Sequence, residues 1–587
     1  MKAADVSDSL YEIPARRGFY IAYKGKTLLS RIDPVAQGER IAEETPLKEK
    51  TLYFCPSPLY GYGLHLFLQK LEKSYAKNSA ILCVEADEKL FEISKKALGG
   101  LLESAKEHSG SEELIPLALV NNSDPESLCS FVRETWGERV FRRVELFRPG
   151  GGWQLFPELY DEMAFTLRRE IALEWGNAMT LIRLGRLYTR NLIRNLAKYA
   201  MSRNIKDLNY GSSPILVLGA GPSIDPILDE LAQLSGGKIP GPGKRPYKII
   251  CVDTSLTALN DRGIIPDLTV ILESQHWNLR DFSGVKDKVI DAAIDLSALP
   301  ASTRVLGGKS LFFTTQWTHL LLFKRLEEAG LLPGTFSPLG SVGLSAVSLA
   351  LYLGTGPVVL GGIDFSYTLD ASHARSTPVH SELLRRQNRF RSLINPAALN
   401  EKGFSALSKC GLTVKSDPVM RNYRDLFIQE FSANTRLLDI KSSGLPLGVN
   451  TLPIAEAHAV LNKSDGSPEG AASSDHLKVV RRASPPGNAA PQNCLPQNNE
   501  GKTIAFIRRE AGYLESLKGI LCGEINTGTE KLEELLDTLD YLWAHFPDCA
   551  GAGGRRPKST DIGFLKRVRT EIDPFLKLWK KTLAELE

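Results

Sequence analysis

The spacing of apolar residues predicts a large parallel sheet in the middle of the chain. Short apolar runs separated by helical patterns recur at 215–218, 248–253, 268–272, 288–295, 310–315 and 357–364. Runs that are apolar throughout, rather than at alternate positions, are typical of parallel strands covered on both faces. We therefore assign residues 210–460 to a doubly wound α/β domain.

A shorter series of the same kind occurs near the N-terminus. A strand at 51–55 is followed by a glycine-containing turn, a helical stretch and a second strand that ends at Glu85 or Asp87. This is the order of a Rossmann-type half, in which such a carboxylate holds a ribose hydroxyl. The turn contains Pro56 and Pro58, and each proline removes a backbone N–H that a phosphate would need. We expect a Rossmann-like N-terminal domain at 1–150 whose role is structural, with ligand binding as the less favoured alternative.

The remaining segments differ in composition. Residues 151–209 have apolar positions at helical spacing and predict a helical connector. Residues 463–501 are rich in Ser, Gly, Pro, Asn and Gln, which favours a flexible linker. A helical C-terminal unit at 502–587 follows from three helical runs, at 503–525, 529–546 and 560–587, the last interrupted by a proline at 574.

Composition narrows the class of protein. The 587 residues include 72 Lys+Arg and 68 Asp+Glu, so the formal net charge is +4, and this balance disfavours a dedicated nucleic-acid binder. We find no apolar window of about 18 residues, no secretory signal, and no metal-ligand spacing among the eight cysteines. These observations predict a cytoplasmic protein without nucleic-acid or membrane partners.

The first motif with chemical content is a glycine turn after the 215–218 strand. Gly219, Gly221, Pro222 and Ser223 form the sequence GAGPS and precede a helical pattern. Glycines allow close approach of backbone to a nucleotide, and a helix N-terminus offers free N–H groups with a partial positive charge. The turn lacks the Lys of a P-loop and the third glycine of G-x-G-x-x-G. It therefore favours, without proving, a ligand site.

The second motif places polar residues at the ends of the next two strands. Asp253 and Thr254 end one strand, and Glu273 and Gln275 end the following one. Doubly wound sheets bind ligands at the carboxyl ends of their strands. Helix capping is the structural alternative for Asp253 and Thr254.

The third motif combines a second helix N-terminus with a polar loop. Gly340 and Ser341 precede a helix of small residues, and the strand at 357–364 ends at Asp364. The loop that follows contains Tyr367 and His373. Loops after strand ends are common places for catalytic groups, although a loop histidine is often merely exposed.

These three blocks resemble a known family. The segments GAGPS, VDTS…GIIPDLTVILES and GSVGLSAVSLALYLG…GGIDFSY…SHA look like the motility-associated factor (Maf) glycosyltransferases, whose domain is also described as 6-hydroxymethylpterin pyrophosphokinase-like, or MptE-like. They are more distantly similar to bacterial sialyltransferases. The resemblance is strong over 210–380 and looser in the N-terminal and C-terminal units.

The resemblance implies an inverting transfer of a nonulosonic acid, of the pseudaminic or legionaminic type, from a CMP-activated donor to Ser or Thr of flagellin. It implies that His373 is the base and that Tyr367 lies near the donor phosphate, one position later than in the sialyltransferase pattern. Donor and nucleotide contacts would come from Gly219, Gly221, Pro222, Ser223, Asp253, Thr254, Glu273, Gln275, Gly340, Ser341, Val342 and Asp364. No D-x-D motif suggests an obligatory metal, and we expect no cofactor.

Two other functions remain open. A pterin or thiamin-type pyrophosphokinase would need Mg²⁺ held by clustered carboxylates, whereas the strand end here reads Leu272-Glu273-Ser274-Gln275 with a single acid. A non-catalytic nucleotide-binding scaffold could keep all three blocks as remnants of its fold. The sequence leaves the sugar, the acceptor site and the oligomeric state undetermined.

Overall fold

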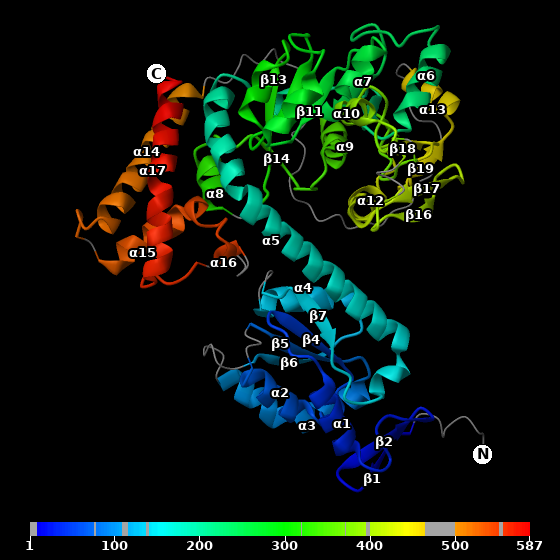
Figure 1. Cartoon of the computed structure of the whole chain (residues 1–587), viewed down its shortest axis with the longest axis vertical. Coiled ribbons are helices and arrows are strands. Elements are labelled where there is room, and N and C mark those ends of the chain that lie inside the picture. The colour runs from blue at the N-terminus through cyan, green and yellow to red at the C-terminus, as the bar shows by residue number, and fades with distance from the viewer. Residues whose placement is uncertain are drawn as a thin grey trace. The chain divides into compact units, whose positions relative to one another are not determined.

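The computed structural model divides the chain into two compact units (Figure 1). Unit 1 comprises residues 1–185 with 543–561, and unit 2 comprises 186–542 with 562–587. The structure describes residues 9–74, 78–107, 115–136, 140–318, 320–369, 371–394, 399–463, 499–526, 528–550 and 556–587. The predicted linker at 463–501 lies almost wholly outside these residues and stays a prediction.

Unit 1 is built on a parallel sheet with the strand order β6-β5-β4-β7. Its strands are β4 (Thr51–Pro56), β5 (Ala80–Glu85), β6 (Leu117–Asn121) and β7 (Arg143–Leu146). A small antiparallel sheet precedes it, formed by β1 (Tyr11–Pro14), β2 (Phe19–Tyr23) and β3 (Lys26–Thr27). The helices are α1 (Pro34–Glu44), α2 (Leu64–Glu72), α3 (Glu88–Glu107), α4 (Pro125–Trp136), the short η1 (Gly152–Leu155), the first part of α5 (Pro157–Ala200) and α16 (Pro547–Ala550).

The apolar runs of unit 1 are explained by two buried faces of its sheet. Leu52 and Phe54 of β4 enter one core cluster, and Tyr53 and Cys55 enter another. Because successive side chains of a strand point to opposite faces, both faces must be covered. This confirms a Rossmann-like α/β arrangement in the N-terminal part.

Unit 2 contains a ten-stranded sheet with all strands parallel. Its order is β14-β13-β12-β11-β10-β9-β15-β18-β19, and β8 pairs with β13. The strands are β8 (Arg203–Asn204), β9 (Ile215–Leu218), β10 (Lys248–Val252), β11 (Leu268–Ile271), β12 (Asp291–Asp295), β13 (Ser310–Thr315), β14 (Gly334–Phe336), β15 (Val358–Gly361), β18 (Leu437–Ile440) and β19 (Asn450–Leu452). The predicted doubly wound domain is confirmed; the sequence pattern missed the four short strands β8, β14, β18 and β19.

Helices and short connections surround this sheet. The helices are α6 (Ile224–Leu234), α7 (Leu256–Asp261), α8 (Leu321–Glu328), α9 (Val342–Leu353), α10 (Pro378–Arg386), α12 (Pro418–Phe431) and α13 (Ile454–Leu461). The 3₁₀ segments are η2 (Ile205–Asp207), η3 (Asp253–Ser255), η4 (His276–Phe282) and η5 (Pro300–Arg304). A hairpin of β16 (Phe404–Leu407) and β17 (Thr413–Ser416) is inserted between α10 and α12.

The order of the strands creates a switch point at β9. The chain runs from β9 outward through β10 to β14 on one side, and then returns to place β15 on the other side of β9. Open α/β sheets bind ligands beyond the carboxyl ends of the strands at such a switch point, so we expect the site of this unit there.

The C-terminal segment is helical, as expected, but it does not form a unit of its own. It contains α14 (Glu500–Leu521), α15 (Thr529–Thr538), η6 (Asp540–Leu542) and α17 (Ile562–Ala584), and all four belong to unit 2. The ion pair Arg325–Glu510, at 2.8 Å, joins α8 to α14. The predicted interruption at Pro574 is wrong: this residue lies inside α17, where Phe575 and Trp579 are buried. Burial of this apolar face offsets the roughly 3 kcal/mol that an interior proline costs.

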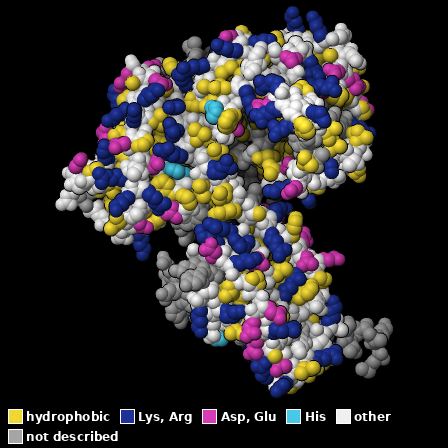
Figure 2. All heavy atoms as spheres, viewed as in Figure 1, with side chains coloured by type: hydrophobic (Ala, Val, Ile, Leu, Met, Phe, Trp, Pro, Cys, Tyr) yellow, Lys and Arg dark blue, Asp and Glu magenta, His cyan; other side chains and the backbone are white. Residues whose placement is uncertain are grey.

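Helix α5 is one continuous helix of 44 residues, and the boundary between the units falls within it, after Gly185. The connector predicted at 151–209 is therefore shared between the two units. No helix among the described residues combines the length and apolarity needed to span a bilayer. On the face shown in Figure 2, basic and acidic side chains are interspersed, in keeping with the small net charge.

Candidate active site

The glycine turn after β9 is pressed against the end of β15. Gly219 N donates to Gly361 O at 2.8 Å, and Gly221 N donates to Gly362 O at 2.9 Å. A Cβ at Gly219 would collide with the carbonyl of Gly362, and one at Gly221 would collide with the carboxylate of Asp364. These glycines are thus required by close packing of two backbones at the switch point.

Asp364 fastens this turn. Its carboxylate accepts hydrogen bonds from Ser223 N at 2.8 Å and from Ser223 Oγ at 2.5 Å. The side chain is buried, and burial raises its pKa while the nearby Lys409 ammonium opposes the rise. Lys409 in turn pairs with Asp439 of β18, at 2.8 Å, with both side chains buried. Asp364 and Ser223 therefore bind each other, which makes them positioning residues.

The N-terminus of α9 lies beside the turn. Gly340 has a positive φ of 67°, which favours glycine, and Ser341 stands at the N-cap without a side-chain capping bond. Cβ atoms built on Gly219 and on Gly343 would both approach the same methyl of Ile363, at 2.9 and 3.3 Å. The described residues provide no hydrogen-bond acceptor for the first amides of α9, from Val342 to Leu344. These amides and the helix dipole can receive an anion next to the glycine turn.

The loop that carries His373 is attached to the same turn. Ala374 N donates to Ala220 O at 3.0 Å, and Arg375 N donates to Asp225 Oδ2 at 2.9 Å. His373 is half-buried, and its Nδ1 lies 3.2 Å from Ser372 Oγ. Burial lowers its pKa, and the neighbouring His380 and Arg280 lower it further. The imidazole is therefore held neutral at pH 7, which is the form that accepts a proton.

Tyr367 is placed elsewhere. It is buried, its backbone pairs with Lys415 of β17, and Asn400 Nδ2 donates to its hydroxyl at 3.0 Å. A Cβ at Gly403 would lie 3.1 Å from the same hydroxyl. The structure thus does not bring Tyr367 to the glycine turn; its contacts hold the β16–β17 hairpin.

Asp253 also faces the interior. Its carboxylate accepts from Thr254 N at 2.8 Å and from Asn278 Nδ2 at 2.7 Å, and Asn278 lies 3.3 Å from the carboxylate of Asp281. Burial raises the pKa of Asp253 to about 7, with a further contribution from Asp281. Burial likewise raises the pKa of Asp281 to about 6. These groups fix η4 onto the end of β10, and the sequence pattern missed both Asn278 and Asp281.

Glu273 and Gln275 lie at the open end of β11. Glu273 is exposed, Gln275 is half-buried, and Gln275 N donates to Glu273 Oε1 at 2.9 Å. Tyr188 of α5 is close enough that Glu273 contributes to raising its pKa, which burial alone already raises. Of the acids predicted to face a ligand, Glu273 is the one that remains accessible.

Two asparagines of α5 complete this edge of the sheet. Asn191 Nδ2 donates to the carbonyls of Ser274 and Ser297, at 2.9 and 3.1 Å. Asn195 Nδ2 donates to Leu296 O and Ala298 O, at 3.0 and 2.9 Å. They are polar positions four residues apart on an apolar helix face, and that spacing is the signal that could have identified them.

In unit 1 the corresponding turn and strand end are bonded to other parts of the same unit. Glu85, at the end of β5, accepts from Ser57 Oγ at 2.8 Å and from Tyr160 Oη at 3.1 Å. A Cβ at Gly152 would collide with Ser57 Oγ, and Gly151 N donates to Leu28 O at 2.6 Å. The structural role expected for the N-terminal domain stays a prediction.

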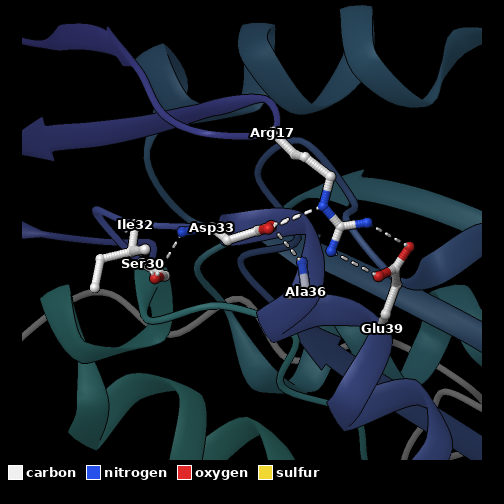
Figure 3. Close-up of polar contacts among 6 residues, drawn as sticks. All are labelled: Arg17, Ser30, Ile32, Asp33, Ala36 and Glu39. Carbon is white, nitrogen blue, oxygen red and sulfur yellow. Dashed lines mark hydrogen bonds and ion pairs between the residues drawn. The ribbon is translucent and has the colours of Figure 1, made fainter.

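A polar cluster near the surface of unit 1 serves helix capping (Figure 3). Asp33 caps α1 by accepting from Ala36 N at 2.8 Å, and Arg17 Nε donates to the same carboxylate at 2.9 Å. Arg17 also reaches Glu39, at 3.1 Å. The hydrogen bond from Arg17 lowers the pKa of Asp33, and the Ala36 amide lowers it further. Arg17 is shared by two carboxylates, so these contacts are explained by capping and ion pairing within the chain.

Among the described residues, no three His, Cys, Asp or Glu side chains are grouped so that they could hold a metal ion.

Comparisons with known proteins agree with this architecture. Residues 190–370 match the family model described as "6-hydroxymethylpterin diphosphokinase MptE-like". The chain is 27% identical over 581 residues to an uncharacterized protein of Treponema pallidum (strain Nichols), covering 98% of this chain and 96% of that one. Its fold is similar to that of the Maf glycosyltransferase from Magnetospirillum magneticum AMB-1, with a TM-score of 0.50 and 14% identity over 98% of this chain and 92% of the other. The resemblance noted from the motifs is thus confirmed for the MptE-like domain and for the Maf fold.

Proposed function

We propose that the protein is a glycosyltransferase that moves a nonulosonic acid from a CMP-activated donor to a Ser or Thr hydroxyl of flagellin. The observation that carries the proposal is the hydrogen bond from Ala374 to Ala220, which joins the loop of His373 to the glycine turn at the switch point. A neutral base, an anion-binding helix end and a close-packed turn therefore meet at one edge of the sheet. The MptE-like domain and the Maf fold support the same assignment.

The proposed reaction needs one base and one anion-stabilising group. The acceptor hydroxyl oxygen attacks the anomeric carbon, the bond from that carbon to the CMP phosphate oxygen breaks, and His373 accepts the hydroxyl proton. Because Nδ1 lies against Ser372 Oγ, Nε2 is the nitrogen available for that proton. The charge that develops on CMP is stabilised by the amides of Val342 to Leu344 at the N-terminus of α9. The CMP phosphate leaves as a stable anion, so this scheme needs no general acid.

The structure changes which residues we expect to touch the donor. Asp253 and Asp364 are buried and bonded within the chain, so we assign them to holding η4 and the glycine turn. Gly340, Ser341 and Val342 stay in the proposed phosphate site, and Glu273 stays at its accessible rim. Tyr367 is assigned to the hairpin.

The test is an assay of flagellin mass. Purified protein is incubated with flagellin and CMP-pseudaminic acid or related CMP-sugars, and CMP binding is measured by calorimetry with wild type and Gly221→Asp. We expect a mass gain equal to one or more sugar residues, and CMP binding that Gly221→Asp abolishes. Absence of a mass gain with every donor, together with absence of CMP binding, would reject the proposal.

A diphosphokinase is the second candidate because the family model carries that description. Such an enzyme needs Mg²⁺ held by clustered carboxylates. Asp253 and Asp281 are buried around Asn278, and Asp295 at the end of β12 is buried and bonded to Ser297 and Thr315. Of these strand-end acids and Glu273, only Glu273 is exposed, so the arrangement favours the transferase. Release of AMP from ATP that depends on Mg²⁺ and a pterin would favour the kinase instead.

A further inference from the structure

Beside the proposed base lies a second histidine whose ring nitrogen has no partner. His380, in the first turn of α10, is only 8% exposed, and its Nδ1 is buried without a hydrogen bond. A buried polar atom left unsatisfied costs about 1–3 kcal/mol, so native structures seldom leave one without a reason. We ask which group could satisfy it.

The position of His380 is fixed by the loop that carries His373. Thr377 caps α10 by accepting from His380 N at 3.4 Å, and its hydroxyl donates to Ala374 O at 2.7 Å. Ala374 is in turn bonded to Ala220 of the glycine turn. A chain of hydrogen bonds thus runs from the turn to the first residues of α10.

A third basic group reaches this place from η4. Arg280 lies on η4, whose other face is held to β10 through Asn278 and Asp253. Its Nη1 meets Glu382 of α10 at 3.5 Å, a long contact, while its side chain remains 48% exposed. Glu382 is shared with Arg386, so it does not neutralise both arginines. The guanidinium therefore keeps donors free for another acceptor.

The electrostatic surroundings of His373 are basic. The two groups that act electrostatically on His373 are His380 and Arg280, and both disfavour its protonation. Among the described residues, no carboxylate is one of the groups that act on it. The acids on the packed elements are Asp225, which is engaged by Arg262 and by Arg375 N, Glu382, and the buried Asp281, whose pKa is raised by burial and lowered in part by Arg280. An anion bound here would satisfy the unpartnered nitrogen of His380 and the donors of Arg280 that remain exposed.

We propose that His380 and Arg280, next to His373, form a subsite for an anionic group of the sugar donor. The subsite rests on the proposed function for the identity of the donor. Two anions of a CMP-nonulosonate could occupy it: the carboxylate of the sugar or the phosphate of CMP. Binding would be through Arg280 at the rim and His380 Nδ1 at the base of the subsite, with the ring of His373 alongside.

Histidine NMR tests the subsite without requiring catalysis. The full chain is labelled with ¹⁵N-histidine, and the rings of His373 and His380 are assigned from His373→Gln and His380→Gln. Four probes are added up to millimolar concentration: CMP, inorganic phosphate, N-acetylneuraminate as a free nonulosonate carboxylate, and uncharged cytidine. We expect the His380 ring signals to move with at least one anion and not with cytidine; N-acetylneuraminate alone would identify the carboxylate, and CMP or phosphate alone the phosphate.

The arginine supplies a variant that leaves the core intact. Arg280→Gln should weaken binding of the effective anion about tenfold, because a charge-assisted hydrogen bond is lost. Arg508→Gln on α14 is the matched control. It removes an exposed arginine that is paired with Glu587, and it should leave binding unchanged. His458→Gln, on α13, is the control for loss of a histidine.

The subsite and the proposed function can fail separately. If no anion moves the His380 signals, or if cytidine moves them equally, the subsite is rejected even when flagellin gains mass. If an anion moves them and Arg280→Gln weakens its binding while flagellin gains no mass, the subsite stands and the transferase proposal falls. Equal binding by wild type and Arg280→Gln would also overturn the subsite.

Discussion

The two units contain the same local arrangement of a turn, a serine and a buried carboxylate, and we assign it a structural role in unit 1 and a place in the proposed ligand site in unit 2. In each, a parallel strand runs into a turn, a serine of the turn donates to a buried carboxylate on a neighbouring strand end, and a glycine packs too closely for a side chain. In unit 1, Ser57, Glu85 and Gly152 are covered by the segment around Leu28. In unit 2, Ser223 and Asp364 bond to each other. The N-terminus of α9 and His373 are not part of that bond, and we propose that they are available to a ligand. The comparison shows that a turn of this kind fixes backbones together, and that what lies beside it determines whether a ligand can bind.

Substituting the close-packed glycines should give the largest difference between the two units, because only the substitution in unit 2 should affect CMP binding. Gly221→Ala and Gly152→Ala each place a Cβ against a side-chain oxygen, Asp364 Oδ2 or Ser57 Oγ, so each should destabilise its own unit by about 1–3 kcal/mol. Only Gly221→Ala should abolish CMP binding and transfer. Calorimetry with CMP and thermal unfolding check this, with Gly512→Ala on α14, where nothing lies within 4 Å, as the control. CMP binding lost equally in Gly152→Ala would break the comparison.

Removing the proposed base should reduce turnover without reducing CMP affinity. His373→Ala should lower kcat by about 10²–10⁴-fold, which is the usual contribution of a general base. Its pKa lies below the ordinary 6.5, so the neutral form is present at pH 7, and kcat/KM should be flat above pH 6.5 and fall as pH drops through that pKa. His380→Gln should move this acid limb to higher pH. Full activity in His373→Ala would refute the assignment.

The buried acid of unit 1 should make that unit sensitive to pH. Burial raises the pKa of Glu85 to about 7 from an ordinary 4.5. The folded form then binds the proton more tightly than the unfolded form, so its stabilising contribution is complete below pH 4.5 and is lost as pH rises toward about 7, on the order of 3 kcal/mol in all. Hydrogen exchange in β4 and β5 measures it. Glu85→Gln should flatten the dependence, and an unchanged slope would contradict the assignment.

The serine hydroxyls should give the smallest difference. Ser57→Ala and Ser223→Ala each remove one buried hydrogen bond to a carboxylate, at a cost of about 1–2 kcal/mol. The stability losses should be similar, whereas only Ser223→Ala should weaken CMP binding, by a few-fold. Parallel denaturant titrations and calorimetry test this; equal effects on CMP binding would remove the functional distinction between the turns.

The parts of the fold set by local pattern were predictable. The strands at 215–218 and 310–315 have the predicted bounds, because uninterrupted apolar runs mark them. The helical pattern expected after GAGPS is the helix α6. The strands β18 and β19 were missed because their three or four residues carry little periodicity of their own. Their place in the sheet depends on pairing, of β18 with β15 and of β19 with β18.

The location of the candidate site stays a prediction, and the sequence did not show which way its acidic side chains point. A carboxylate at a strand end can face a ligand or the interior, and distant residues decide which. Asp253 faces inward because Asn278 binds it, and Asp364 does so because Ser223, 141 residues earlier, binds it. The contact of Tyr367 with Asn400 was not predictable for a similar reason, since Asn400 lies 33 residues later in the chain.

The pairing of β9 with β15 also has a consequence for how the protein is made. Val358 pairs with Ile215, so one edge of β9 stays without its neighbour until about 140 more residues have been synthesised. At roughly 5–20 residues per second, that interval is on the order of ten seconds. During it, an apolar strand edge is open to wrong pairing with other chains. The strand order that places the proposed site at β9 thus delays the assembly of that site. While the chain is being synthesised, the open edge of β9 has to be protected from wrong pairing until β15 has been made.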